Sequence, residues 1–168
     1  MFSRTAMDEQ LPVATGSHTM KDILLVEDNS NDVELVLMVL ERNQIANQVV
    51  VARDGAKALD YLYREGEFAP RKGGNPAVIL LDLNMPGLDG MEVLRRVKSD
   101  ARLKTIPVVI LTSSRADRHL VESYDLGVNA FVVKPVHFSE FVKAVSHLGV
   151  FWALINQPPA ESAGERAP

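Results

Sequence analysis

The sequence predicts an α/β protein whose core is a doubly wound, five-stranded parallel sheet. Five apolar runs of four residues alternate along the chain with segments of helical period, and they occupy 23–26, 49–52, 78–81, 108–111 and 130–133. Continuous rather than alternating apolarity is typical of strands that are covered on both faces. Right-handed crossovers place the intervening helices on the two faces of such a sheet. We therefore expect one (βα)5 domain.

The segments between the runs carry apolar stripes that predict five helices. Residues of each stripe recur at three or four positions, the spacing of one helix face. Start signals are Asn29 or Ser30 for the first helix, and the pairs Asp54-Gly55 and Asp89-Gly90 for the next two; Gly127 would end the fourth. The stripes are Val33, Val36, Leu37 and Leu40; Ala58, Leu59 and Leu62; Met91, Leu94 and Val97; Leu120, Val121 and Tyr124; and, beginning near Ser139, Phe141, Val142, Val145, Leu148, Phe151, Trp152 and Ile155.

Composition bounds the domain organisation and the class of protein. The chain has 168 residues, which we divide into a polar leader (1–20), one domain with an extended last helix (21–157) and a tail poor in large apolar residues (158–168). The segment 65–77, with two prolines and three glycines, is predicted to be an exposed loop. No run is long enough to span a membrane and no signal peptide is present, so we expect a cytoplasmic protein. A net charge of -4 is not typical of a protein that binds nucleic acid, so we expect no nucleic-acid partner. The absence of cysteine excludes thiolate chemistry.

Polar residues follow four of the five predicted strands. In an open parallel sheet, functional groups gather beyond the carboxyl ends of the strands. The first run is followed by Glu27-Asp28, the third by Asp82, the fourth by Thr112-Ser113 and the fifth by Lys134-Pro135. Each of these alone has an ordinary explanation as a capping or solvated residue. Their convergence predicts three carboxylates, one hydroxyl and one ammonium in one small space.

Three carboxylates at one strand edge predict a metal site. Clustered carboxylates repel one another and raise one another's pKa unless a cation lies among them. A hard ion of the Mg2+ type fits oxygen ligands, whereas Zn2+ is disfavoured because no histidine or cysteine follows these strands. A carboxylate that faces a metal, an ammonium and a hydroxyl is a natural phosphoryl acceptor. Asp82 is the central candidate for that role, with Glu27 and Asp28 on the metal side.

Four motifs together resemble the receiver domain of two-component response regulators, which has a flavodoxin-like fold. They are VEDN at 26–29, LLDLNMPGLDG at 80–90, LTSS at 111–114 and VVKP at 132–135, and the resemblance extends from about residue 21 to residue 148. The resemblance implies that Asp82 accepts the phosphoryl group and that the only catalysis is self-catalysed uptake and hydrolysis. The Mg2+ site that it implies consists of Glu27, Asp28, Asp82 and the backbone carbonyl of Asn84. The implied switch residues are Thr112 and Phe131, and the implied partner of the phosphoryl group is Lys134, followed by a cis peptide bond to Pro135. The implied residues that govern access of water are Asn84 and Ser114.

A closer resemblance is to stand-alone receivers that pair with phytochrome histidine kinases in bacteria. It rests on the loop 65–77, the block 111–135 and the ending FWALINQPP. The implied partner is a histidine kinase of phytochrome type. Only 20 residues follow Leu148, so we expect the signal to leave through protein contacts of the receiver. Phe151, Trp152 and Ile155 extend the last stripe and predict a homodimer contact, or else a helix end folded back on its own domain.

Two other classes of protein stay open at this point. A phosphatase of haloacid-dehalogenase type also uses a strand-end aspartate with Mg2+, but Asn84 stands where its second aspartate would be. A pseudo-receiver would keep the fold without the chemistry, which the complete set of acids, hydroxyl and lysine disfavours. The four histidines, His18, His119, His137 and His147, have no mutual ligand spacing and are predicted to be surface or helix residues.

Overall fold

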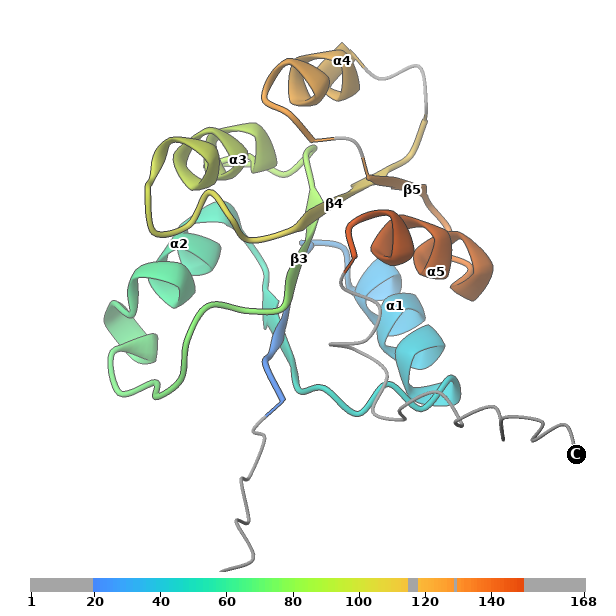
Figure 1. Ribbon diagram of the computed structural model, residues 1–168, viewed down its shortest axis with the longest axis horizontal. Coiled ribbons are helices and arrows are strands. Elements are labelled where there is room, and N and C mark those ends of the chain that lie inside the picture. The colour runs from blue at the N-terminus through green and yellow to red at the C-terminus, as the bar shows by residue number, and fades with distance from the viewer. Residues whose placement is uncertain (1–19, 115–117, 129, 150–168) are drawn as a thin grey trace, which may run out of the picture.

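The fold is a parallel sheet with helices on both faces. The computed structural model describes residues 20–114, 118–128 and 130–149 (Figure 1). Its five strands are all parallel and are ordered β2-β1-β3-β4-β5. The predicted strands are confirmed to within one residue at either end. They are β1 (Ile23–Val26), β2 (Val49–Ala52), β3 (Val78–Asp82), β4 (Val108–Thr112) and β5 (Phe131–Val133).

The first three helices begin where the sequence places capping residues. The side chains of Asn29, Asp54 and Asp89 each accept a hydrogen bond from a backbone N–H in the first turn of the following helix. Such caps satisfy donors that the helix cannot pair internally. Among the described residues, no helix is long and apolar enough to cross a membrane. The helices are α1 (Ser30–Arg42), α2 (Gly55–Tyr63), α3 (Gly90–Ser99), α4 (Arg118–Asp125) and α5 (Phe138–His147), with a short 3-10 helix, η1 (Gly66–Phe68), after α2.

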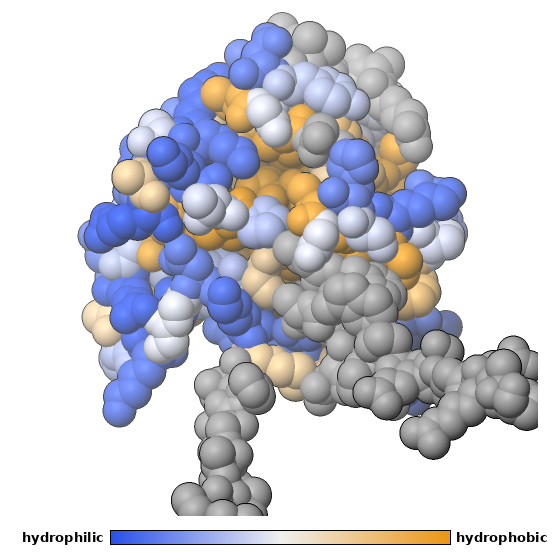
Figure 2. Space-filling view, viewed as in Figure 1, coloured by the Kyte–Doolittle hydropathy of each residue, from blue (hydrophilic) through white to orange (hydrophobic). Residues whose placement is uncertain are grey.

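The sheet separates two hydrophobic cores. One lies under α2 and α3 and includes Tyr61 and Leu94; the other lies under α1 and α5 and includes Leu40 and Phe141. Figure 1 shows these two pairs of helices on opposite sides of the strands. In the space-filling view, hydrophilic residues cover much of the outer surface and hydrophobic residues gather between the helices (Figure 2). Strand residues alternate between the two cores, which explains the continuous apolar runs of the sequence.

Two predicted helical stripes differ from the structure. Tyr124 of α4 is 54% exposed, and its ring lies against that of Phe131 of β5, with centroids 4.5 Å apart, at the rim of the core. The helix α5 ends at His147, earlier than predicted, and Gly149 has a φ of 70°, in the left-handed region. Phe151, Trp152 and Ile155, the predicted dimer contact, lie outside the described residues.

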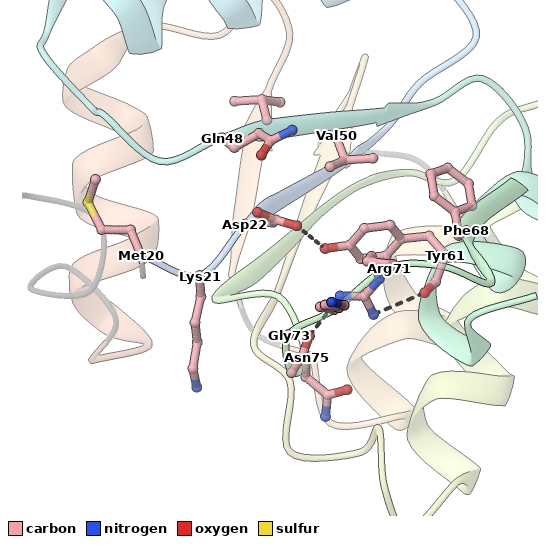
Figure 3. A pocket seen from close by; sticks show the side chains of 13 residues that line it. Met20, Lys21, Asp22, Gln48, Val50, Tyr61, Phe68, Arg71, Gly73 and Asn75 are labelled. Atoms are coloured by element: carbon pink, nitrogen blue, oxygen red, sulfur yellow. Dashed lines mark hydrogen bonds between the residues drawn. The ribbon is translucent and has the colours of Figure 1, made fainter. Parts of the chain in front are cut away.

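The connection 65–77, predicted to be an exposed loop, is held against α2 by several contacts, among which those of Arg71 reach the core. Arg71 places its guanidinium carbon 4.0 Å from the ring centroid of the buried Tyr61 and donates hydrogen bonds to the carbonyl oxygens of Tyr61 and Gly74. The Tyr61 hydroxyl donates to Asp22 at 2.7 Å, and Phe68 packs edge-on against the same ring (Figure 3). Burial and the bond to the Asp22 carboxylate raise the pKa of Tyr61 above its usual range. The connection therefore packs beside β2, and residues of both line the pocket shown in Figure 3.

Replacing Arg71 by alanine is expected to loosen this connection. Loss of the cation–π contact and of two hydrogen bonds should lower the free energy of unfolding by about 1–2 kcal/mol, measured by urea denaturation. Chymotryptic cleavage after Phe68 should become faster, because the segment that follows Phe68 is no longer anchored to Tyr61. The matched control is Lys72→Ala, which removes the exposed neighbouring cation. Equal effects of the two substitutions on stability and cleavage would contradict this account.

Candidate functional site

Acidic residues meet where β1 and β3 end. The register pairs Val26 with Leu81 and Asp82 with Leu111, so the residues that follow these strands emerge at one edge of the sheet. Glu27, Asp28 and Asp82 each offer a carboxylate oxygen, and the three oxygens lie within 4.8 Å of one another. Glu27 is completely buried and Asp82 is 4% exposed. The structure thus brings together the three acids that the sequence predicts.

Gly90 allows this edge to be compact. A Cβ atom at Gly90 would collide with the backbone carbonyl of Asp82. Only a residue without a side chain lets the first turn of α3 lie directly against the end of β3. The turn from Asp82 to Gly90 therefore returns to the end of β3, and the backbone of Asp82 is fixed from that side.

Lys134 is the positive centre of the cluster. Its Nζ lies 3.0 Å from Glu27 Oε2, 3.0 Å from Asp32 Oδ2 and 3.2 Å from Asp82 Oδ2. Burial alone would lower the pKa of Lys134, but its hydrogen bonds to Glu27 and Asp32 and the charge of Asp82 outweigh burial and raise the pKa above its usual range. The lysine is therefore charged at neutral pH. The Lys134-Pro135 peptide bond is cis, as the resemblance implies.

One ammonium does not balance the acids around it. Burial raises the pKa of Glu27 to about 7; the bond from Lys134 opposes this shift and the charge of Asp82 adds to it. Such a shift means that the fully ionised cluster is costly without more positive charge. An oxygen-rich, over-acidic pocket matches the preference of Mg2+ and similar hard cations. The residues present thus fit a divalent metal ion.

Asp32 is a member of the cluster that the sequence argument missed. It lies in the first turn of α1, where acidic residues are common because they favour the helix N-terminus. The available signal was geometric: α1 begins at Ser30, immediately beyond the end of β1, so its first turn stays at the same edge. Asp32 shares Lys134 with Glu27 and Asp82.

Thr112 and Asn84 lie beside the acidic cluster and make hydrogen bonds that the sequence does not predict. The prediction placed the Thr112 hydroxyl in the same space as the carboxylates, whereas the structure has it donating to the carbonyl oxygen of Ser114 at 2.8 Å. Thr112 remains next to Lys134, whose backbone N–H donates to the Thr112 carbonyl oxygen at 2.7 Å. The backbone N–H of Asn84 donates to Asp82 Oδ1 at 2.9 Å. Each Asp82 carboxylate oxygen thus has a donor.

His119 adds a contact that sequence reasoning did not find. It lies in α4, as expected of a helix residue, and its Nδ1 is 3.1 Å from Asn84 Oδ1. The contact joins α4 to the turn after β3. No spacing in the sequence indicates it, because 35 residues separate the two partners.

Comparison with known proteins identifies the family to which this chain belongs. The sequence pattern of the response regulator receiver domain matches residues 23–146. The chain belongs to this family. Receiver domains bind a divalent metal ion and take their signal from histidine kinases, so the chain is a signalling protein whose partner is a histidine kinase. The family assignment gives no support to the phosphatase alternative.

Three phytochrome-related or cyanobacterial relatives are similar over almost their whole length. The structure of the bacteriophytochrome response regulator AtBRR is 61% identical with a TM-score of 0.77, covering 82% of this chain and 99% of that one. The phosphorylated cyanobacterial phytochrome response regulator RcpA is 41% identical with a TM-score of 0.66, covering 83% and 99%. Response regulator Rcp1 of Synechocystis sp. is 41% identical over 138 residues, 81% of this chain and 91% of Rcp1. A structure of Rcp1 in its Mn2+-bound form is 39% identical with a TM-score of 0.65, covering 83% and 99%.

Proposed function

We propose that this chain accepts a phosphoryl group on Asp82 from a histidine kinase of phytochrome type, in the presence of Mg2+, and signals through protein contacts of its receiver domain. The observation that carries the proposal is the environment of Asp82. Its Oδ2 lies 3.2 Å from Lys134 Nζ and its Oδ1 accepts from the Asn84 backbone, while Glu27 and Asp28 lie beside it. A carboxylate so placed can act as nucleophile while neighbouring groups match the charge of the incoming phosphoryl oxygens.

Different residues of the chain act as nucleophile, as metal ligands and as a positive charge in the proposed phosphoryl transfer. An Asp82 carboxylate oxygen forms the new P–O bond as the P–N bond of a phosphohistidine breaks, and the departing imidazole nitrogen recovers a proton. Mg2+ held by Asp28, Glu27, Asp82 and the Asn84 carbonyl would neutralise charge on the phosphoryl oxygens. Lys134 supplies a second positive charge and orients the carboxylate. Hydrolysis reverses the attachment: a water oxygen bonds to phosphorus and the Asp82 carboxylate leaves.

The switch in this proposal begins at Thr112. Its hydroxyl now donates to Ser114, so it must leave that bond in order to donate to a phosphoryl oxygen. Phe131 is on the neighbouring strand β5 and packs against Tyr124 of α4. A movement of Thr112 that Phe131 follows would therefore alter the surface formed by α4 and β5. Phosphorylation would shift a population between two arrangements of this surface.

The type of kinase rests on the relatives. AtBRR is described as a bacteriophytochrome response regulator and RcpA as a cyanobacterial phytochrome response regulator. The identity of 61% to the former, over nearly all of its length, supports the same class of partner here. A cytoplasmic location and a homodimer that uses Phe151, Trp152 and Ile155 belong to the same proposal, as does the division into a leader (1–20), a receiver (21–157) and a tail (158–168).

Phosphotransfer tests the proposal directly. A phytochrome-type histidine kinase, autophosphorylated and freed of nucleotide, should pass its phosphoryl group to this chain in Mg2+ and not in EDTA. A histidine kinase from an unrelated pathway should transfer far more slowly. Borohydride reduction and mass spectrometry should locate the acyl phosphate on the peptide that contains Asp82. A label on another residue, or sustained turnover of p-nitrophenyl phosphate instead of transfer, would contradict the proposal.

A further inference from the structure

We propose that His119 is a positioning residue that prolongs the life of the phosphorylated form by holding the side chain of Asn84. This inference rests on the proposed phosphorylation of Asp82. It concerns the step that ends the signal, which is the attack of water on the aspartyl phosphate. Its basis is the contact between α4 and the turn after β3.

Two hydrogen bonds connect the acceptor to α4. The Asn84 backbone N–H donates to Asp82 Oδ1 at 2.9 Å, and the Asn84 side-chain oxygen lies 3.1 Å from His119 Nδ1. Asn84 is exposed and His119 is half-buried, whereas Asp82 is buried. The Asn84 side chain is thus an exposed polar group two residues from the buried acceptor, so it can meet water that approaches a phosphoryl group on Asp82.

The chemistry of an amide fixes the sense of the second bond. An amide oxygen can only accept a hydrogen bond, so His119 Nδ1 must carry the proton. Asn84 Oδ1 is then engaged with α4. An attacking water is helped by a nearby oxygen that accepts one of its protons and orients its lone pair. While His119 holds Asn84 Oδ1, this oxygen is less able to do so.

The contact also ties hydrolysis to the position of α4. His119 belongs to α4, whereas Asn84 belongs to the turn that follows the acceptor at the end of β3. A displacement of α4 that lengthens the 3.1 Å contact releases Asn84 and exposes the phosphoryl group to faster hydrolysis. For the same reason, a partner that fixes α4 in the present position would keep Asn84 bound to His119 and prolong the phosphorylated state.

A double-mutant cycle tests this role. The variants are His119→Ala, Asn84→Ala and both together, with His119→Gln as the matched control because glutamine keeps a donor of similar reach. Each protein is phosphorylated with acetyl phosphate and Mg2+, the donor is removed, and the decay of the phosphorylated form is followed on a phosphate-affinity gel. We expect His119→Ala to speed decay about threefold to tenfold, the range of one hydrogen bond, while His119→Gln stays closer to wild type.

The cycle separates positioning from a general structural effect. In the Asn84→Ala background, His119→Ala should change the decay rate no further, and uptake of phosphate by the His119→Ala and His119→Gln single variants should stay within about twofold of wild type. An unchanged or slower decay in His119→Ala, or the same acceleration without the Asn84 side chain, would overturn the inference. Failure of the proposed function has a different signature: the wild-type protein itself would take up no phosphate at Asp82.

Discussion

Asparagine in place of Asp82 is expected to abolish phosphoryl uptake without loss of the fold. The amide is nearly isosteric with the carboxylate, and its one oxygen can still accept from Lys134 or from the Asn84 backbone, which contact different oxygens of Asp82. The amide is not a nucleophile. The substitution also removes one of the clustered negative charges. In EDTA the variant should therefore be as stable as wild type or more stable, by about 1 kcal/mol near neutral pH.

The stability that Asp82→Asn gains in EDTA should increase as pH rises. The pKa of Glu27 is raised from 4.5 to about 7, so its protonated form is favoured by folding. The stability contributed by that shift is complete below pH 4.5 and is lost as pH rises towards 7. Asp82 is one cause of the shift, so Asp82→Asn should reduce this loss. Thermal unfolding in EDTA from pH 5 to pH 8 measures the difference between the two proteins.

The matched control for Asp82→Asn is Asp89→Asn. Asp89 caps α3 by accepting from the Glu92 backbone N–H, and asparagine caps a helix about as well as aspartate. The same chemical change seven positions further along should leave uptake from acetyl phosphate near the wild-type rate. Phosphorylation of Asp82→Asn at the wild-type rate would show that another residue is the acceptor.

The parts of the fold that local rules determine were predictable from the sequence. Runs such as 78–81 have no alternation because helices cover both faces of their strands, and this is visible in the residues themselves. Asn29, Asp54 and Asp89 act through hydrogen bonds only two or three residues long, so their role is legible from spacing. The acidic cluster followed because parallel strands bring their ends to one edge.

The parts that were missed depend on contacts between distant segments. Asp32 reaches Lys134 across 102 residues, and His119 reaches Asn84 across 35. Arg71 lies in a segment rich in glycine and proline, and in the sequence nothing distinguishes it from a solvated loop cation; its partner, the ring of Tyr61, lies ten residues earlier in a different element. The Thr112 hydroxyl was assigned to the cluster because its strand ends there, yet a local bond to Ser114 competes for it. In each case the rotamer and partner are set by packing, which no periodicity encodes.

Methionine in place of Lys134 is expected to make the stability of the fold depend on divalent metal. The substitution keeps the length of the side chain and removes the ammonium that contacts Glu27, Asp32 and Asp82. Removing one partner from a buried ion cluster typically costs about 3–5 kcal/mol, because the remaining charges stay buried without compensation. In EDTA the variant should therefore unfold at a much lower urea concentration than wild type.

Mg2+ should recover part of that loss. With Lys134 gone, the carboxylates are more negative, so a divalent cation should bind about tenfold more tightly or better. Metal at 100 times its dissociation constant contributes about 2.7 kcal/mol of stability. Acidification should act in the same direction, because protonating Glu27 removes a buried charge. Urea unfolding with Mg2+ and with EDTA, at pH 5.5 and 7.5, measures both effects.

Arginine at position 134 is the comparison that isolates charge from shape. Lys134→Arg keeps the positive charge, so its stability in EDTA should lie well above that of Lys134→Met even where the bulkier guanidinium fits the cluster poorly. Phosphoryl uptake should fall in both variants, since neither places an ammonium against Asp82. If Lys134→Met were as stable as wild type in EDTA and indifferent to Mg2+, the lysine would not be what compensates the buried carboxylates.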